Sequence, residues 1–313
     1  MAAAVTVRRR LPRAAMRSLI LPLLLTAHGP GAGGARAESP VERGSYLVNT
    51  ILACGNCHTP KSADGSPIAE MNLAGGGLSF TTPGFNATAS NITPDRKTGI
   101  GSWTDAEIKR ALIEGVRPNH GRLAGVPLAA VMPVSFYKAL LPRDLDAVVA
   151  YLRSVRPVQH TVPDPLYKQP VRHDRYPDAE AGFTEESLRD PVRKGAYLVT
   201  IGHCMECHST RVGPVSDYQK GFGKGGRPFG VKLVQGFPAA WNGSIAPNIT
   251  SHPVSGIGAW TDIEIKRAIT QGISRSGRKL QPPMGFAWYA GMTEADLNAI
   301  VAWLRTVPPL ASE

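Results

Sequence analysis

The 313-residue sequence lacks several features that would place it in common protein classes. Beyond its N-terminal segment it has no apolar run of the roughly 18 residues that a membrane-spanning helix needs, which excludes a polytopic membrane protein. Hydrophobic residues make up 42% and charged residues 19% of the chain, which excludes a disordered protein. Its 33 glycines and 27 prolines follow no Gly-X-Y period, which excludes collagen. The length predicts about two folded domains.

The N-terminal segment accounts for much of the formal charge of +11. Arginines at positions 8, 9, 10, 13 and 17 precede an apolar stretch from Leu19 to Ala27 and a small-residue segment that ends at Ala35-Arg36-Ala37. This order predicts a secretory signal peptide cleaved after Ala37, with a retained membrane anchor as the alternative. Removal of residues 1–37 takes away six arginines and no acidic residue, so the charge falls from +11 to +5. A charge of +5 does not indicate nucleic-acid binding. We expect a periplasmic protein, either free or held at the outer face of the inner membrane.

Cysteine is scarce, and all four cysteines lie in two copies of one motif. The copies are Cys54-Gly-Asn-Cys57-His58 and Cys204-Met-Glu-Cys207-His208. The pattern C-x-x-C-H is typical of c-type haem attachment, because one helical turn presents two thiols to the vinyl groups and places the next imidazole under the ring. A zinc ribbon needs two cysteine pairs about 15–20 residues apart. Here residues 58–203 lie between the two cysteine pairs. A thioredoxin-type site would not require either His, and two ordinary disulfides are the remaining alternative. We predict two covalently attached haem c groups.

The two motifs lie in two similar halves of the chain. The segments that correspond are Gly44-Ser-Tyr46-Leu47 with Gly195-Ala-Tyr197-Leu198, Asn91-Ile-Thr with Asn248-Ile-Thr, and Trp103-Thr-Asp with Trp260-Thr-Asp. This order predicts a duplicated domain, over residues 38–156 and 191–313. Residues 157–190 are rich in proline and form the predicted linker, either a semi-rigid spacer or a strap over one domain.

The periodicity predicts an all-α fold with three helices in each half. The first helix of each half covers about 42–52 or 192–202 and leads into the haem motif. The second begins at a capping box, Thr104 with Glu107 or Thr261 with Glu264. The third carries the apolar stripe that includes Leu145 or Leu297. No strand pattern is sustained.

Each haem iron of an electron carrier needs a second axial ligand besides His58 or His208. Met132 and Met284 occupy matched positions, each 19 residues before Tyr151 or Trp303, and we predict that they are these ligands. The competing candidates are His120 and Met71 in the first half and Met292, His252 and His203 in the second. His160 and His173 lie in the linker, where we expect solvent exposure.

The sequence resembles the bacterial cytochrome c subunits of periplasmic dehydrogenases of the alcohol, aldehyde, sugar-acid and molybdenum-hydroxylase types. The resemblance is carried by the haem motifs, Asn91-Ile-Thr-Pro-Asp, Met132-Pro and Tyr151-Leu-Arg, over most of residues 40–156 and 190–308. The sequence differs from many of these cytochrome subunits because it has two haem motifs rather than three. In addition, Met284 precedes Gly rather than Pro.

The resemblance implies two tandem class I cytochrome c domains. By that resemblance Cys54, Cys57, Cys204 and Cys207 hold haem, and the iron ligands are His58, Met132, His208 and Met284. It also implies a protein that is not itself an enzyme but passes electrons from a dehydrogenase catalytic subunit to a quinone, another cytochrome or a terminal oxidase. The alternative is a dihaem enzyme such as a peroxidase, in which one iron has an open coordination position.

Overall fold

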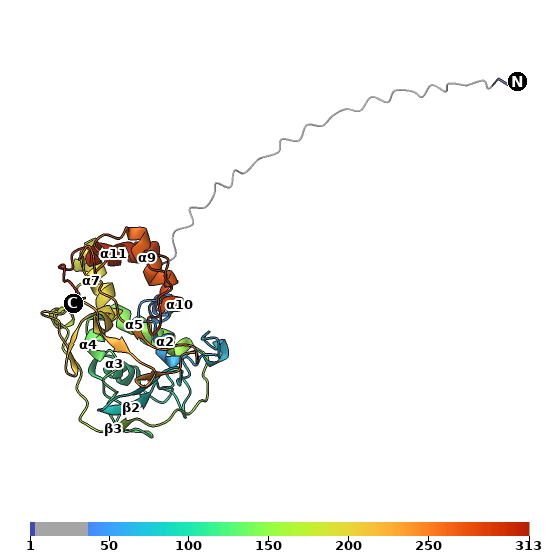
Figure 1. Ribbon diagram of the computed structural model, residues 1–313. Helices are drawn as coiled ribbons and strands as arrows, with labels where there is room; N and C mark the ends of the chain where they lie inside the picture. The colour runs from blue at the N-terminus through green and yellow to red at the C-terminus, as the bar shows by residue number, and fades with distance from the viewer. Residues whose placement is uncertain (4–36, 313) are drawn as a thin grey trace. The chain divides into compact units, whose positions relative to one another are not determined.

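Five α-helices of the first half recur in the same order in the second half, and Figure 1 labels most of them. The first half contains α1 (Pro40–Asn49), α2 (Cys54–His58), α3 (Asp105–Glu114), α4 (Val134–Tyr137) and α5 (Pro142–Ser154). The second contains α7 (Pro191–Ile201), α8 (Cys204–His208), α9 (Asp262–Gln271), α10 (Phe286–Tyr289) and α11 (Glu294–Leu304). The remaining helical segments are α6 (Pro177–Ala181) and the short 3-10 turns η1 (Ala69–Met71) and η2 (Ser187–Arg189). This recurrence agrees with an internal duplication.

The computed structural model describes residues 1–3 and 37–312. The predicted signal peptide therefore lies almost entirely outside the described residues. Both halves and the connector between them belong to one compact unit, Glu38–Glu313, which begins one residue after the predicted cleavage position. Among the described residues, no helix has the length and apolar character needed to cross a membrane.

The helices α3 and α9 begin where the sequence predicts. The Thr104 hydroxyl accepts the backbone N–H of Glu107, and the Glu107 carboxylate accepts the backbone N–H of Thr104. Thr261 and Glu264 form the same reciprocal pair at the start of α9. Such pairs satisfy backbone donors that the first helical turn leaves without partners. These predicted helices are confirmed.

The core of each half forms where its first helix crosses its last helix, α1 on α5 and α7 on α11. A Cβ atom on Gly44 would lie 1.9 Å from the backbone oxygen of Ala147, and one on Gly195 would lie 1.9 Å from that of Ala299. Only glycine permits so close an approach of two helix backbones. The same crossing therefore holds both halves, and it positions the start of the haem motif that follows α1 and α7.

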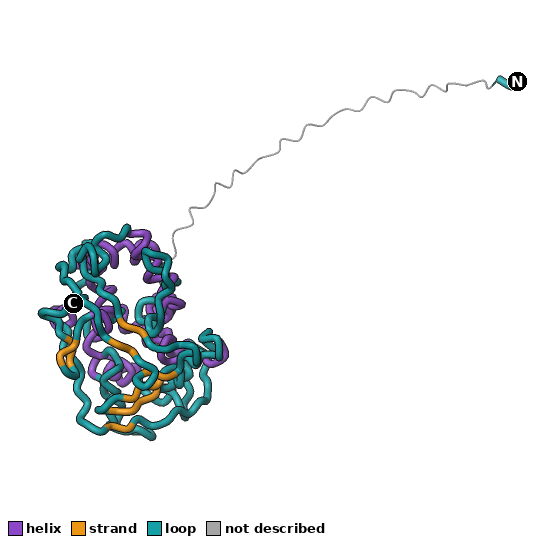
Figure 2. Tube along the Cα trace, viewed as in Figure 1, coloured by secondary structure: helices purple, strands orange, loops and turns teal. Residues whose placement is uncertain are grey.

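The prediction of an all-α fold is wrong, because the described residues also form eight short β-strands (Figure 2). The strands are β1 (Ser79–Thr81), β2 (Phe85–Thr88), β3 (Leu166–Tyr167), β4 (Arg211–Val212), β5 (Val215–Ser216), β6 (Pro228–Phe229), β7 (Val234–Gln235) and β8 (Ser244–Ile245). Four of them form an antiparallel sheet in the order β3-β2-β1-β7, while β4 pairs with β5 and β6 with β8. These strands have two to four residues, too few for alternation of apolar and polar residues to be recognised. The fold is mixed α and β.

The four-stranded sheet joins both halves and the connector. In its centre Phe80 of β1 lies opposite Ala87 of β2 on one side and Val234 of β7 on the other. At one edge Tyr167, from the connector, lies opposite Phe85. The sheet therefore ties the haem-motif region of the first half to the corresponding region of the second.

The connector is a strap over the first half rather than a spacer. The side-chain amide of Asn91 donates to the backbone oxygen of Val158 at 2.7 Å, and the Tyr167 hydroxyl donates to the backbone oxygen of Pro127 at 2.6 Å. Tyr176 is completely buried, and its ring packs against Phe136 at a centroid distance of 4.7 Å. These contacts fix the connector along most of its length.

A matched pair of tyrosine–carboxylate hydrogen bonds also joins the halves. Tyr46 of α1 donates to the Asp296 carboxylate of α11 at 2.5 Å, and Tyr197 of α7 donates to the Asp144 carboxylate of α5 at 2.7 Å. Because the same pair of positions contributes to both bonds, the contact has the reciprocal form of a two-fold symmetric interface within one chain.

Candidate cofactor site

Each haem-motif helix follows a residue with left-handed backbone conformation. Ala53 before α2 has φ 46° and His203 before α8 has φ 43°. Residues with side chains rarely adopt this conformation, and surrounding structure must stabilise it at a cost of about 1–3 kcal/mol. The turn redirects the chain sharply after α1 and α7. It therefore sets the direction in which Cys54 and Cys204 enter the motif helix.

The motif histidines are oriented by backbone carbonyls. The Nδ1 atom of His58 lies 2.6 Å from the backbone oxygen of Ser90, and that of His208 lies 2.8 Å from the backbone oxygen of Pro247. Because Nδ1 then carries the proton, Nε2 has a free lone pair. Burial lowers the pKa of both imidazoles, although the carbonyl contact opposes this. Both side chains therefore favour the neutral form that binds a metal ion.

No disulfide joins the four motif cysteines, all of which lie in the described part of the chain. Burial raises the pKa of Cys54, Cys204 and Cys207 to about 12 and that of Cys57 to about 11. A redox-active thiol has instead a lowered pKa that maintains the thiolate. The surroundings of these thiols therefore disfavour a thioredoxin-type site.

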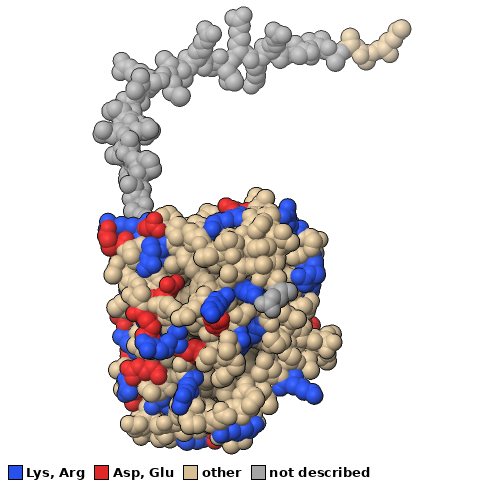
Figure 3. Space-filling model, turned by 60° about the vertical axis from the view of Figure 1, so that its left-hand side comes forward, with Lys and Arg blue, Asp and Glu red and all other residues tan. Residues whose placement is uncertain are grey.

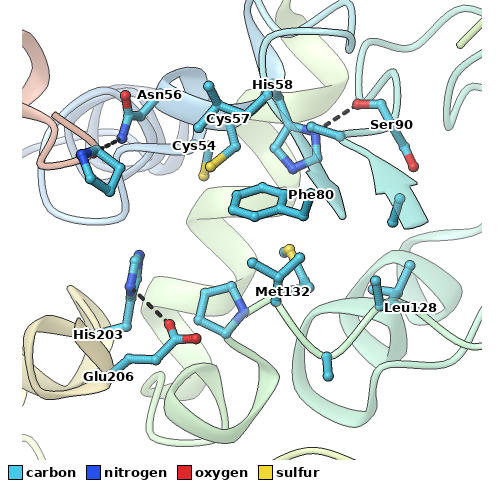
Figure 4. A pocket seen from close by; sticks show the side chains of 18 of the residues that line it. Cys54, Asn56, Cys57, His58, Phe80, Ser90, Leu128, Met132, His203 and Glu206 are labelled. Carbon is cyan, nitrogen blue, oxygen red and sulfur yellow. Dashed lines mark hydrogen bonds and ion pairs between the residues drawn. The ribbon is translucent and has the colours of Figure 1, made fainter. Parts of the chain in front are cut away.

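Both motifs and both predicted methionine ligands line a continuous cavity of about 1840 Å³. Pockets for a single small molecule have about 300–1,000 Å³, so this cavity can hold two large groups. Figure 4 shows Cys54, Cys57 and His58 on one side of the first-half region and Met132 on the opposite side. In the second half His208 and Met284 line the same cavity. The structure thus brings every predicted site residue to its walls.

The competing axial ligands occupy less suitable positions. Met71, Met292 and His252 are not among the residues that line the cavity. His120 and His203 line it, but the His120 ring contacts Glu107 at 3.0 Å, and the His203 ring contacts Glu206 at 3.3 Å. Met132 and Met284 both line the cavity, and their role as axial ligands stays a prediction.

The linker histidines are not the solvent-exposed residues that we expected. The Nδ1 atom of His160 contacts the backbone oxygen of Ala74 at 3.0 Å, and its side chain is half-buried. His173 is also half-buried and lines the cavity, and its buried Nε2 atom has no partner among the described residues. Both differences arise because the connector packs against the first half as a strap.

Sequence reasoning missed the aromatic residues of the cavity wall. These include Phe80 of β1, Tyr137 of α4 and Tyr289 of α10, which all line the cavity. Tyr137 and Tyr289 each lie five residues after a predicted methionine ligand, so their matched spacing was the available signal. Phe80 had no such counterpart because Gly230 occupies the corresponding position in the second half.

Residues 192–308 match the family model for cytochrome c. The second half is similar to a cytochrome c domain. The matched region of this domain includes α8 and Met284, and the first half repeats its helices and its motif. The half-buried thiols and the imidazoles held by carbonyls fit the covalently bound haem that defines this family.

The chain is also similar to cytochrome subunits over more than four fifths of its length. It is 30% identical to a fructose dehydrogenase cytochrome subunit of Gluconobacter japonicus, over 88% of this chain and 54% of the relative. It is 31% identical to the cytochrome c subunit of a quinone alcohol dehydrogenase of Gluconacetobacter polyoxogenes, over 89% and 59%. A dihaem c-type cytochrome of Cereibacter sphaeroides is 26% identical over 82% of both chains. The chain spans less than two thirds of the first two relatives. The predicted resemblance to cytochrome c subunits of dehydrogenases is confirmed.

Proposed function

We propose that this protein is a dihaem cytochrome c that carries electrons and is not itself catalytic toward an organic substrate. When bound, haem c supplies a one-electron couple between ferric and ferrous iron. Cys54 and Cys57 would hold one haem, and Cys204 and Cys207 the other. The observation that carries the proposal is the repeated placement of a carbonyl-held histidine and a methionine in the walls of one cavity.

The axial residues favour electron transfer over chemistry at the metal. His58 with Met132, and His208 with Met284, provide two protein ligands for each site, so neither iron would have a position for a substrate. A thioether ligand raises the reduction potential relative to a second imidazole. The apolar cavity walls also disfavour the additional positive charge of ferric iron. Both halves therefore suit a high-potential carrier.

The relatives and the sequence together suggest the partners and the compartment. The electron donor in this proposal is the catalytic subunit of a dehydrogenase, and the acceptor is a quinone, another cytochrome or a terminal oxidase. The N-terminal sequence supports export to the periplasm. Figure 3 shows basic and acidic side chains together on one face of the compact unit, a surface suited to protein partners of mixed charge.

The test uses the full chain matured with haem and compares ligand binding with peroxide turnover. A mass increase equal to two haems, no carbon monoxide binding to the reduced protein and no turnover of hydrogen peroxide are expected. Carbon monoxide binding at one haem together with peroxide reduction would contradict the carrier and indicate a dihaem peroxidase. A mass increase equal to one haem would contradict the dihaem proposal.

A further inference from the structure

The short helices α4 and α10 hold the same place in the two halves but differ in how far they are covered. All four residues of α4 are buried. The structure describes every residue of α10, and none of them is buried. Ser135 in α4 is almost completely buried, whereas Ala287, at the corresponding position of α10, is exposed. Because the two halves share one arrangement of helices, the difference must come from a segment that covers only the first half.

The strap is that segment. The Ser135 hydroxyl donates to the backbone oxygen of Asp174 in the strap. The strap helix α6 packs against α4, and Asp164 of the strap forms an ion pair with Arg122 in the loop before α4. The strap therefore covers the helix and also neutralises a positive charge of the loop that precedes it.

The loops before α4 and α10 correspond residue by residue at their ends. Each is closed by a backbone hydrogen bond to the glycine that ends the preceding helix, from Leu128 at 2.8 Å and from Leu280 at 2.7 Å. Position 127 therefore corresponds to position 279. The Tyr167 hydroxyl of the strap bonds the backbone oxygen of Pro127. The strap has no counterpart over Lys279 in the described part of the chain, and this lysine is exposed.

The loop of the second half carries positive charge only. Residues 273–283 include Arg275, Arg278 and Lys279 and no acidic residue, and all three cations are exposed. Arg275 lies 3.7 Å from Glu264. Within residues 37–312, Arg278 and Lys279 have no ion-pair partner. A negatively charged partner would complement this surface.

The second half also provides the path along which the strap begins in the first half. The side-chain amide of Asn248 donates to the backbone oxygen of Leu310 at 2.6 Å. In the same way Asn91 donates to the backbone oxygen of Val158, where the strap starts. Both halves thus hold the chain that leaves their last helix in the same way. Of the residues that the structure describes, none follows this path onward over α10.

We propose that residues 273–283 together with α10, here called the open face, bind an extended, acidic segment of a partner protein. This segment takes the place over the second half that the strap takes over the first. Its carboxylates pair with Arg275 and Lys279 as Asp164 pairs with Arg122, and the half-buried rings of Phe286 and Trp288 supply apolar contact. Because the open face consists of protein side chains alone, binding there does not depend on the proposed carrier function.

The test uses the full haem-loaded chain and the synthetic peptide Glu-Val-Pro-Asp-Pro-Leu-Tyr-Glu, which copies residues 162–167 of the strap and adds an acid at each end. We expect this peptide, at millimolar concentration, to slow amide hydrogen exchange in residues 274–281 and 286–289. The same peptide with lysine in place of each acid should not. The double variant Arg275→Glu, Lys279→Glu should bind the acidic peptide about tenfold more weakly, because like charges then oppose each other.

The control is the double variant Arg189→Glu, Lys220→Glu, which removes the same charge from exposed residues outside the open face and should bind like the parent. Arg278 is left unchanged because it lines the cavity. Absence of any protection, protection confined to other segments, or equal binding by the parent and the Arg275→Glu, Lys279→Glu variant would overturn the proposal.

Sedimentation of the parent without peptide tests the other occupant of the open face. We expect a monomer. A dimer that the Arg275→Glu, Lys279→Glu variant abolishes would overturn the partner segment in favour of a second copy of this chain. Failure of the carrier function is a separate result, visible in the parent as a missing haem or as carbon monoxide binding.

Discussion

At the scale of single residues, the site depends on side chains whose protonation is set by burial and by one strong partner. His58 and His208 are held neutral with Nε2 free. Asp144, by contrast, is fully buried as a carboxylate. Arg43 contacts both of its oxygens at 2.9 Å, and Tyr197 donates a third hydrogen bond. Substitution of a ligand residue should therefore change a reduction potential, whereas substitution of a structural residue should change the free energy of unfolding.

Met132→His should lower the reduction potential of one haem and leave the other unchanged, because two imidazoles favour ferric iron more than imidazole with thioether. A spectroscopic redox titration of the loaded protein measures both potentials. Met71→Leu is the matched control, since Met71 does not line the cavity. A potential that shifts in Met71→Leu and not in Met132→His would contradict the ligand assignment.

Asp144→Asn should destabilise the protein by about 3–5 kcal/mol, because it leaves the Arg43 charge without its buried partner. Urea unfolding of the haem-loaded chain measures this loss. Asp296→Asn is the matched variant in the second half, where Lys194 contacts the carboxylate at 2.6 Å. We expect a smaller loss there, because lysine lacks the two-pronged geometry of arginine. Equal losses of stability would show that the two-pronged contact of Arg43 with Asp144 adds nothing beyond a single ion pair.

The same carboxylate gives stability a defined dependence on pH. Burial alone would raise the pKa of Asp144, but the hydrogen bonds and charge of Arg43 hold it below its ordinary value of 3.8. Its stabilisation is therefore complete above about pH 4 and is lost as the pH falls through the folded-state pKa. Asp144→Asn should abolish this part of the acid sensitivity. An unchanged acid-unfolding curve would contradict the contribution of Asp144.

At the scale of elements, each half is organised by the close crossing of its first and last helices. Gly44→Ala should cost about 1–3 kcal/mol or more, because the methyl group overlaps the backbone of α5 and neither helix can yield locally. Gly84→Ala is the control and should change the free energy of unfolding by no more than about 0.5 kcal/mol, since the nearest atom to a Cβ there is 3.7 Å away. Denaturant unfolding compares the two variants. Similar stabilities would show that the crossing tolerates a side chain.

The helices could be predicted from sequence and the strands could not, for a physical reason. Thr104 with Glu107 is a local signal, since the residues that satisfy the helix end lie within one turn. The pairing of Phe80 with Val234 joins segments far apart in the chain, and each strand is too short to show a pattern of its own. The burial of His173 likewise depends on the path of the connector, which its local sequence does not reveal.

At the scale of the compact unit, the two halves form one reciprocal assembly. The duplication and the candidate ligands could be predicted because matched spacing is visible along the sequence. The contact between the halves could not, because Tyr46 and Asp296 become partners only after both halves have folded. The apolar cluster against which Cys57 and Cys207 each pack likewise combines residues of both halves.

Tyr46→Phe and Tyr197→Phe should each cost about 1.5–3 kcal/mol, because each removes a hydrogen bond to a carboxylate across the boundary. Unfolding is followed separately at the haem absorption of each half.

One coincident transition is expected in the parent protein, since the halves share the sheet and the strap. Two separate transitions in the parent would contradict a single cooperative unit.

The central claim is that the chain holds two haems, each closed by a histidine and a methionine. The most direct measurement is a spectroscopic redox titration of the full haem-loaded protein that follows the far-red band of thioether-ligated ferric haem. We predict two high-potential, one-electron steps, with the band accounting for both haems and lost stepwise on reduction. A low-potential or high-spin haem in either half would contradict the claim for that half.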